Sequence, residues 1–167
     1  MADFEQALRD RIARNAELAR EREQAERDLE RYERERREAE ARADRERHQA
    51  RMARHAELAD RLAAAARGLK AASPDKFVVR LGWTESGEEF IAKVSTRQTW
   101  PARTLLIELD RDDDEVLVRW DTEVGNALEL WRLLEVDTGL IETLVLQAAD
   151  QQLWREGVVP PFPVSSG

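Results

Sequence analysis

The fold of this chain is decided by the stretch RTLLIELDRDDDEVLVRWD, residues 103–121. Apolar and polar side chains alternate in its first and last parts, which is the period of a half-buried β-strand. The connection between these parts, from Asp110 to Asp114, is too short for a helical crossover and is almost entirely acidic. Strands over 103–110 and 115–121 are therefore predicted to pair in antiparallel order.

The same two-residue period occurs upstream of this stretch. Residues 76–83 and 88–96 each place alternate apolar side chains on one face, and the segment Glu85-Ser86-Gly87 between them is typical of a hairpin loop. Trp83 falls in phase with its apolar neighbours and is predicted to lie in the core. Together the two pairs predict a four-stranded antiparallel sheet, because consecutive hairpins form a meander.

Downstream of residue 121 the period becomes helical. Residues 126–136 and 137–156 carry apolar side chains every three or four positions, and Asp137 or Thr138 fits the N-cap of the second helix. The segment 128–136 also fits a strand. The sequence thus predicts an α+β head in which one or two C-terminal helices pack on one face of a four-stranded antiparallel sheet.

The first seventy residues are built differently from the rest. Ala, Arg, Glu, Leu, Gln and Asp dominate up to Arg67, and all seven glycines and all five prolines follow that residue. Most of these residue types favour helices, so we expect one continuous helix of roughly 65 residues, about 100 Å long at 1.5 Å per residue. Such a helix is too long to pack on one small domain, which leaves a coiled coil or a free-standing, salt-bridged helix.

An apolar stripe at seven-residue spacing favours the coiled coil. The register slips near residues 52–57, and a second stripe begins there. Seven pairs of an acidic residue followed by arginine four positions later would equally support an isolated helix. We expect a parallel homodimer, with an antiparallel pair or a heteromeric partner as alternatives. The large side chains predicted to form the oligomerisation seam are Leu8, Leu18, Leu29, Tyr32, Leu58 and Leu62.

These patterns predict three segments: a coiled-coil helix over 1–70, an acidic α+β head over 71–157 and a proline-rich tail over 158–167. Residues 1–70 carry 18 basic against 17 acidic side chains and residues 71–167 carry 9 against 18, so the acidity lies in the head and tail. Negative charge repels phosphate and argues against nucleic-acid partners. Because no apolar run is long enough to cross a membrane and cysteine is absent, we expect no membrane partner and a cytoplasmic location.

The sequence offers little for catalysis, and neither a metal nor a cofactor is predicted. The only two histidines, His48 and His55, are seven residues apart, which is not the spacing that holds a metal from one helix. The run from Asp110 to Asp114 begins like a calcium loop, but Glu115 stands where the sharp turn of such a loop needs glycine. The chain is therefore predicted not to be an enzyme.

The predicted function is a non-enzymatic adaptor or scaffold whose head binds a basic or amphipathic protein. Trp100, outside any periodic segment, is the candidate apolar anchor, and Asp112, Asp113 and Asp114 supply the charge. The alternative is a small acidic chaperone or inhibitor, similar in kind to secretion chaperones or antitoxins, which an exposed apolar groove on the head would favour. The layout is similar to that of coiled-coil subunits with compact α+β heads, such as those of kinetochore complexes, a likeness of architecture that rests on no motif.

Overall fold

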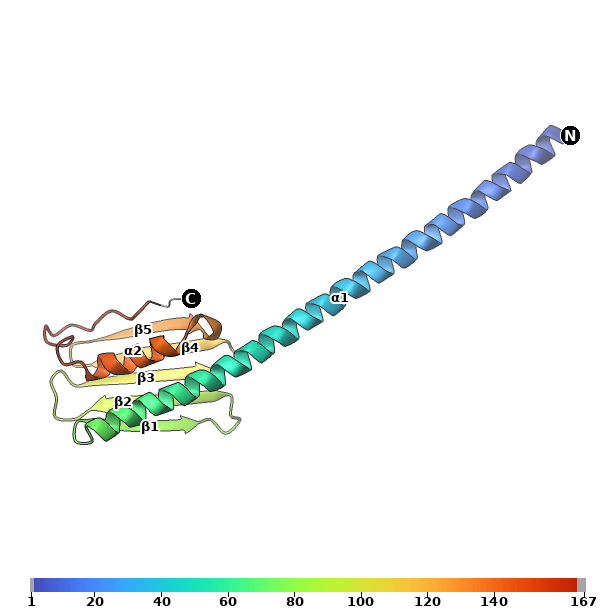
Figure 1. The fold of residues 1–167 in the computed structure, drawn as a ribbon. Coiled ribbons are helices and arrows are strands. Elements are labelled where there is room, and N and C mark those ends of the chain that lie inside the picture. Colours follow the sequence, from blue (N-terminus) through green and yellow to red (C-terminus); the bar gives the residue numbers. More distant parts are fainter. Residues whose placement is uncertain (1, 165–167) are drawn as a thin grey trace. The chain divides into compact units, whose positions relative to one another are not determined.

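The computed structural model describes residues 2–164, in which one long helix precedes a sheet and a second helix. The chain divides into two compact units, the first ending at Arg47 and the second, which we call the head, beginning at His48. In chain order the elements are α1 (Ala2–Ala72), β1 (Phe77–Trp83), β2 (Glu89–Thr96), β3 (Arg103–Asp110), β4 (Glu115–Thr122), β5 (Gly125–Arg132), the 3-10 turn η1 (Leu133–Glu135) and α2 (Thr138–Ala149) (Figure 1).

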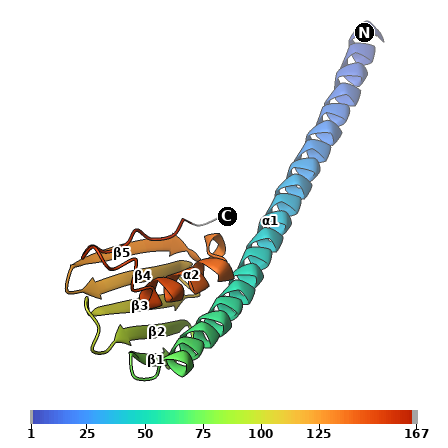
Figure 2. The same cartoon turned by 60° about the vertical axis from the view of Figure 1, so that its left-hand side comes forward.

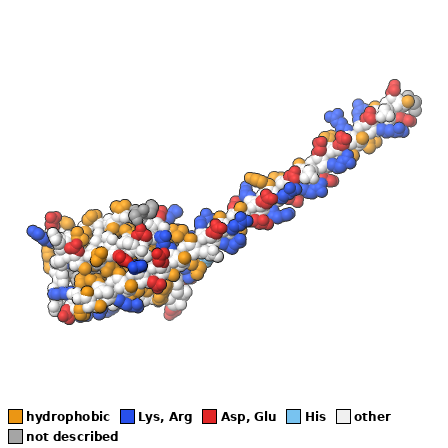
Figure 3. Space-filling model, in the orientation of Figure 1, with side chains coloured by type: hydrophobic (Ala, Val, Ile, Leu, Met, Phe, Trp, Pro, Cys, Tyr) orange, Lys and Arg blue, Asp and Glu red, His pale blue; other side chains and the backbone are white. Residues whose placement is uncertain are grey.

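The part of α1 in the first unit is helical because no glycine or proline interrupts its backbone hydrogen bonds. All its described side chains are exposed except that of Ala7, which is half-buried. Acidic and basic side chains are interspersed over this part of the helix (Figure 3), and exposed ion pairs such as Arg22 with Glu26, 3.5 Å apart, join successive turns. Each such pair stabilises a helix by only about 0.3–0.5 kcal/mol.

The later part of α1 belongs to the core of the head. Its buried side chains recur every three or four residues and so form one face. That face packs on the sheet, and the head therefore begins within α1, well before the boundary that the sequence predicted at residue 70. The buried residues are His55, Leu58, Ala59, Leu62 and Ala66.

The five strands form an antiparallel meander in the order β1-β2-β3-β4-β5. Buried and half-buried residues alternate strictly along β3, where Leu105, Ile107 and Leu109 point into the core. The views in Figures 1 and 2 place α2 and the later part of α1 on one face of the sheet. The head is thus a two-layer α+β structure with its core between the helices and that face.

The helix α2 starts where the sequence predicts. The Asp137 carboxylate caps it by accepting a hydrogen bond from the Leu140 N–H at 2.8 Å. The helix ends at Ala149, earlier than predicted, because the following residues form turns whose N–H groups bond to the third preceding carbonyl. These turns bring Trp154 into the core against Trp120, with ring centroids 5.0 Å apart.

The predictions of four strands and of a helix over 126–136 are wrong. That segment forms β5 and η1, and the sheet has five strands. The apolar residues of the segment fit both periods, since Ala127 and Trp131 are four residues apart and also lie on one face of a strand. All eight residues of β5 pair with β4, and this pairing makes the segment a strand rather than a helix. A tertiary contact of this size overrides a weak local preference.

Leu58 and Leu62 do not form part of an exposed seam. Both side chains are 0% exposed and lie in the same core as Ile107 and Leu144. Because neither leucine has surface left for a second helix, we correct the oligomerisation seam to the four remaining positions within residues 4–32. The register slip predicted near residues 52–57 marks the start of the face that α1 presents to the sheet.

The proline-rich C-terminal segment packs on the head as far as the structure describes it. Pro160 is buried, and the ring of Phe162 lies edge-on to that of Trp131 with centroids 6.1 Å apart. The side-chain amide of Gln147 donates a hydrogen bond to the Pro161 carbonyl at 3.2 Å. Residues 159–162 therefore lie against β5 and α2, Val164 is exposed, and the last three residues of the predicted tail lie outside the described residues.

Candidate functional site

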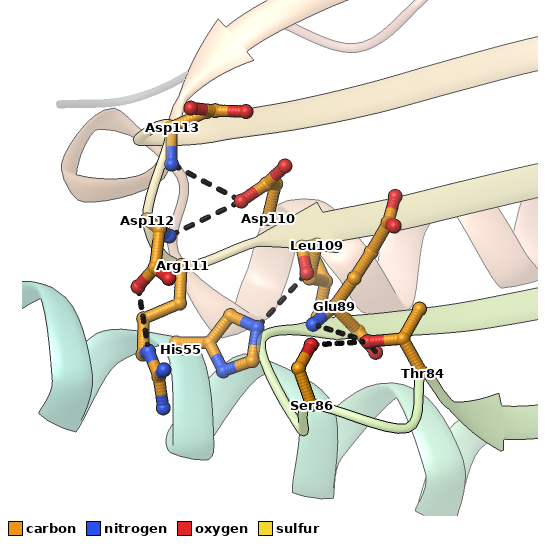
Figure 4. Close-up of polar contacts among 9 residues, drawn as sticks. All are labelled: His55, Thr84, Ser86, Glu89, Leu109, Asp110, Arg111, Asp112 and Asp113. Carbon is orange, nitrogen blue, oxygen red and sulfur yellow. Dashed lines mark hydrogen bonds and ion pairs between the residues drawn. The ribbon is translucent and has the colours of Figure 1, made fainter.

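Two hairpins bring carboxylates together at one end of the sheet. In an antiparallel meander the β1–β2 and β3–β4 connections lie at the same end, and Figure 4 shows residues of both connections near His55 of α1. We call this region the acidic end. Its carboxylates are Glu85, Glu88, Glu89, Asp110, Asp112, Asp113, Asp114 and Glu115.

Asp110 organises the β3–β4 loop. Its Oδ1 accepts hydrogen bonds from the N–H groups of Asp112 and Asp113, each at 3.1 Å, which is the local turn that aspartate favours. The Arg111 guanidinium donates to Asp112 at 3.0 Å. The loop thus holds the next three carboxylates in place, and the run that begins like a calcium loop is the tip of a hairpin.

The carboxylates of the acidic end shift one another's pKa values. A hydrogen bond with Asp112, together with the charge of that residue, raises the pKa of Glu88 above its usual value. The charge of Asp110 raises the pKa of Asp113, while the hydrogen bond from Arg111 lowers that of Asp112. Partial burial, followed by the charge of Glu108, raises the pKa of Glu89. A cationic partner would relieve this repulsion between like charges.

Trp83 presents an aromatic surface at the same end. Its ring lies 5.5 Å from that of His55 and 4.9 Å from that of Phe90, yet 53% of its surface is exposed. A hydrogen bond of 2.9 Å between His55 Nε2 and the Leu109 carbonyl fixes the imidazole beneath it. The sequence places Trp83 in the core, and this prediction is wrong because the residue is the last of its strand and is covered on one side only.

A groove of about 570 Å³ lies on the β5 side of the acidic end, lined by Asp113, Asp114, Glu115, Leu130, Trp131, Arg132 and Glu135. The Asp114 Oδ1 atom is buried and has no hydrogen-bond partner among the described residues. A buried hydrogen-bond acceptor that has no donor lowers the stability of the folded state. A partner that supplied a guanidinium or ammonium group here would have a receptive carboxylate beside apolar surface.

The structure does not bring Trp100 together with Asp112, Asp113 and Asp114. Trp100 follows β2 and the aspartates follow β3, so β3 separates them by roughly 25 Å at about 3.3 Å per residue. Trp100 is 59% exposed, and a Cβ at Gly157 would come within 3.3 Å of its ring, so the indole rests on that glycine. The predicted anchor and the predicted charges therefore belong to opposite ends of the head.

The predicted seam residues of the first unit remain available to a partner. Leu8, Leu18, Leu29 and Tyr32 are all exposed, as are Phe4 and Ile12 on the same stretch of α1. Isolated exposed leucines are common on proteins. A repeated stripe of them on a solvated helix is typical of a helix that associates.

An apolar groove lies between α1 and α2 in the head. It encloses about 440 Å³ and is lined mainly by alanine and aliphatic side chains. The ion pair between Arg61 and Glu142, 3.0 Å long, crosses its rim, and Leu146 beside it is 67% exposed. Small residues such as Ala64 and Ala65 let another chain approach closely.

Residues 2–164 contain neither a cluster of metal-ligating side chains nor a helix of membrane-spanning length and hydropathy. No group of three or more histidine, cysteine, aspartate or glutamate side chains in this part of the chain is placed to hold a metal ion. No helix in it is both long and apolar enough to span a bilayer. His55, the more buried of the two histidines, is already engaged with the Leu109 carbonyl.

Comparison with known proteins found no family model, no curated protein and no solved structure that matches this chain. The geometry of the acidic end, the exposed stripe of α1 and the groove between α1 and α2 are therefore the observations on which a functional interpretation rests.

Proposed function

We propose that the chain is a non-enzymatic adaptor that self-associates through the stripe of residues 4–32 and binds a basic protein at the acidic end of its head. The observation that carries this proposal is the exposed ring of Trp83, the last residue of β1, at the same end of the sheet as the carboxylates of the two hairpin loops. Aromatic side chains at the centre of charged surfaces are frequent hot spots of protein interfaces. Trp83 thus replaces Trp100 as the proposed anchor.

The charge of the acidic end suits the encounter step of such binding. Clustered carboxylates attract a basic partner over a screening length of about 8 Å at physiological salt and set the association rate more than the final affinity. The apolar surface of Trp83 and the groove beside Asp114 then slow dissociation. An adaptor needs both properties, because selection of its partner and retention of it are separate requirements.

A chaperone or inhibitor is the second candidate, favoured by the apolar groove between α1 and α2. Its alanine-lined floor and the exposed Leu146 beside it would accept an apolar segment of a client protein. In that function the carboxylates would keep the complex soluble rather than select the partner.

Affinity capture from the native host tests both candidates when the immobilised full chain is compared with three variants. The adaptor predicts that Trp83→Ala raises the dissociation rate of the captured partner about tenfold. Replacing Asp112, Asp113 and Asp114 together by Asn should slow association and flatten its salt dependence. Asp110 is left intact because it holds the loop. The third variant, Leu146→Glu, should leave this partner bound.

Trp100→Ala is the matched control, since it removes an equally exposed indole at the opposite end of the head. Melting temperatures of all variants exclude loss of folding as the cause. The adaptor proposal would be contradicted if the Trp83→Ala variant and the triple-aspartate variant bound the captured partner as the parent chain does. Loss of the captured protein in Leu146→Glu alone would assign the chain to the chaperone class.

A further inference from the structure

The outer edge of the sheet at β1 carries unpaired backbone groups. The Thr84 N–H donates to the Glu89 carbonyl and the Arg97 N–H donates to the Lys76 carbonyl, so the even-numbered residues of β1 bond to β2. Bonded and non-bonded pairs alternate in an antiparallel ladder. The N–H and C=O groups of Phe77, Val79, Leu81 and Trp83 therefore point away from the sheet.

Nothing in residues 2–164 pairs with this edge. No backbone or side-chain hydrogen bond in the described part of the chain reaches the outward groups of β1, and the strand holds neither proline nor a bulge. The opposite edge differs, because the C-terminal segment packs beside β5 through Phe162 and Val159. Natural proteins usually protect a seven-residue apolar edge strand, so an open one is a template for a further strand.

A shallow groove flanks this edge on each face of the sheet. On the helix side, a groove of about 460 Å³ is lined by Arg67, Lys70, Ala71, Val79 and Leu81. On the other face, a groove of about 320 Å³ includes Arg80, Ile91, Lys93 and Leu106. Because side chains of an added strand alternate between the two faces, each groove would receive every second side chain.

The two grooves have the same chemistry, in that each combines aliphatic surface with two exposed cations. Arg67 and Lys70 line the groove on the helix side, and Arg80 and Lys93 line the groove on the other face. None of these four takes part in an ion pair within the described residues. Arg80 and Lys93 even stand directly opposite each other in the ladder, an arrangement that destabilises a sheet.

We propose that the β1 edge binds an extended acidic segment of a partner protein, which adds to the sheet as a sixth strand beside β1. Backbone pairing supplies the affinity, and the four cations select carboxylates among the alternate side chains. The same cations disfavour pairing of β1 with β1 of a second copy, because that arrangement would bring two such basic sets together. This edge meets the acidic end at Trp83, but its four cations and the outward groups of Val79 and Leu81 belong to the edge alone, so each proposal can fail without the other.

Hydrogen exchange in the full chain tests the proposal with the synthetic peptide acetyl-EEVVEEV-amide, which offers glutamate and valine to both grooves. Without peptide the outward N–H groups of Val79 and Leu81 should exchange rapidly, and the N–H of Arg80, paired with β2, should exchange slowly. Saturating peptide should slow exchange at Val79 and Leu81 at least tenfold and leave Arg80 unchanged. The basic peptide acetyl-KKVVKKV-amide, and the acidic peptide N-methylated at alternate residues, should have no such effect.

Charge reversal provides the matched variants. Arg80→Glu with Lys93→Glu should weaken binding of the acidic peptide on the order of tenfold or more. Arg20→Glu with Arg155→Glu makes the same change in net charge at exposed positions away from both grooves and should bind like the parent. Absence of protection at millimolar peptide, equal protection by the basic peptide, or equal weakening by both charge-reversed pairs would overturn the proposal. Protection of Val79 that rises with protein concentration alone would do so too, and would identify a second copy as the occupant.

Discussion

A chain that begins at residue 72 should fail to fold, whereas a chain that begins at residue 48 should unfold in one cooperative transition. The shorter chain lacks Leu58 and Leu62, which are fully buried, and leaves the core face of the sheet uncovered. Burial of each leucine contributes about 1.5–3 kcal/mol, and a domain has a net stability of only about 5–15 kcal/mol. Urea unfolding followed by tryptophan fluorescence measures the difference.

Point variants in the full chain separate packing from chain length. Leu62→Ala should lower the free energy of unfolding of the head by about 2–5 kcal/mol, because it leaves a cavity in the core. Leu29→Ala, on the exposed stripe of the first unit, should leave that free energy unchanged. A cooperative transition in the chain that begins at residue 72, or a negligible effect of Leu62→Ala, would refute the assignment of the later part of α1 to the head.

Arg103→Met should be the most destabilising substitution of a charged residue in the head. Arg103 is 3% exposed, and its guanidinium donates to the Ala148 carbonyl at 2.9 Å, to the Pro101 carbonyl at 3.1 Å and to the Gln151 side chain at 3.2 Å. It also lies 4.9 Å from the ring centroid of Trp154. Burial lowers the pKa of Arg103 from its usual value. Methionine fills the space but leaves these acceptors unpaired, at a cost of about 2–4 kcal/mol.

Arg155→Met is the control for this substitution, because Arg155 is exposed and the change there should stay within about 0.5 kcal/mol. The free energy of unfolding from urea titration decides the comparison. Equal effects at the two positions would mean that the hydrogen bonds of Arg103 do not hold the end of α2 to the start of β3.

Much of the fold could be predicted from local patterns. Alternation alone gives the bounds of β3, and the absence of glycine and proline before residue 68 predicts that α1 is one continuous helix, although α1 passes through Gly68 and ends at Ala72. The segment 126–136 could not be predicted in this way, because Ala127 and Trp131 satisfy both the helical and the strand period. Pairing with β4 makes the segment a strand rather than a helix, and local sequence does not reveal that partner.

The sequence also does not show whether an apolar helix face packs on the sheet of its own domain or on a second helix. The four-residue spacing of Leu58 and Leu62 fits a coiled-coil seam as well as a helix face that packs on a core. Helix geometry produces the same spacing in the two cases. The change of register near residues 52–57 is the one signal that distinguishes them from Leu29. It marks the place where the apolar face turns to the sheet.

The candidate site shows the same dependence on tertiary arrangement. The carboxylates of the β3–β4 loop are evident in the sequence, but their aromatic neighbour is not, because Trp83 has the phase of a core residue. Its place as the last residue of β1, before a turn that contains Gly87, is the signal that could have identified it as exposed. Trp100 and the β3–β4 loop do not form one surface, since the meander places them at opposite ends of β3.

Sedimentation equilibrium of the full chain tests whether the first unit associates while the head is left to bind partners. We expect a dimer or larger assembly for the full chain at micromolar concentration. We expect a monomer for residues 48–167 and for the full chain with Leu29→Asp and Tyr32→Asp, two exposed residues of the stripe. A monomeric full chain, or the same assembly in the chain that lacks the first unit, would contradict association through the first unit.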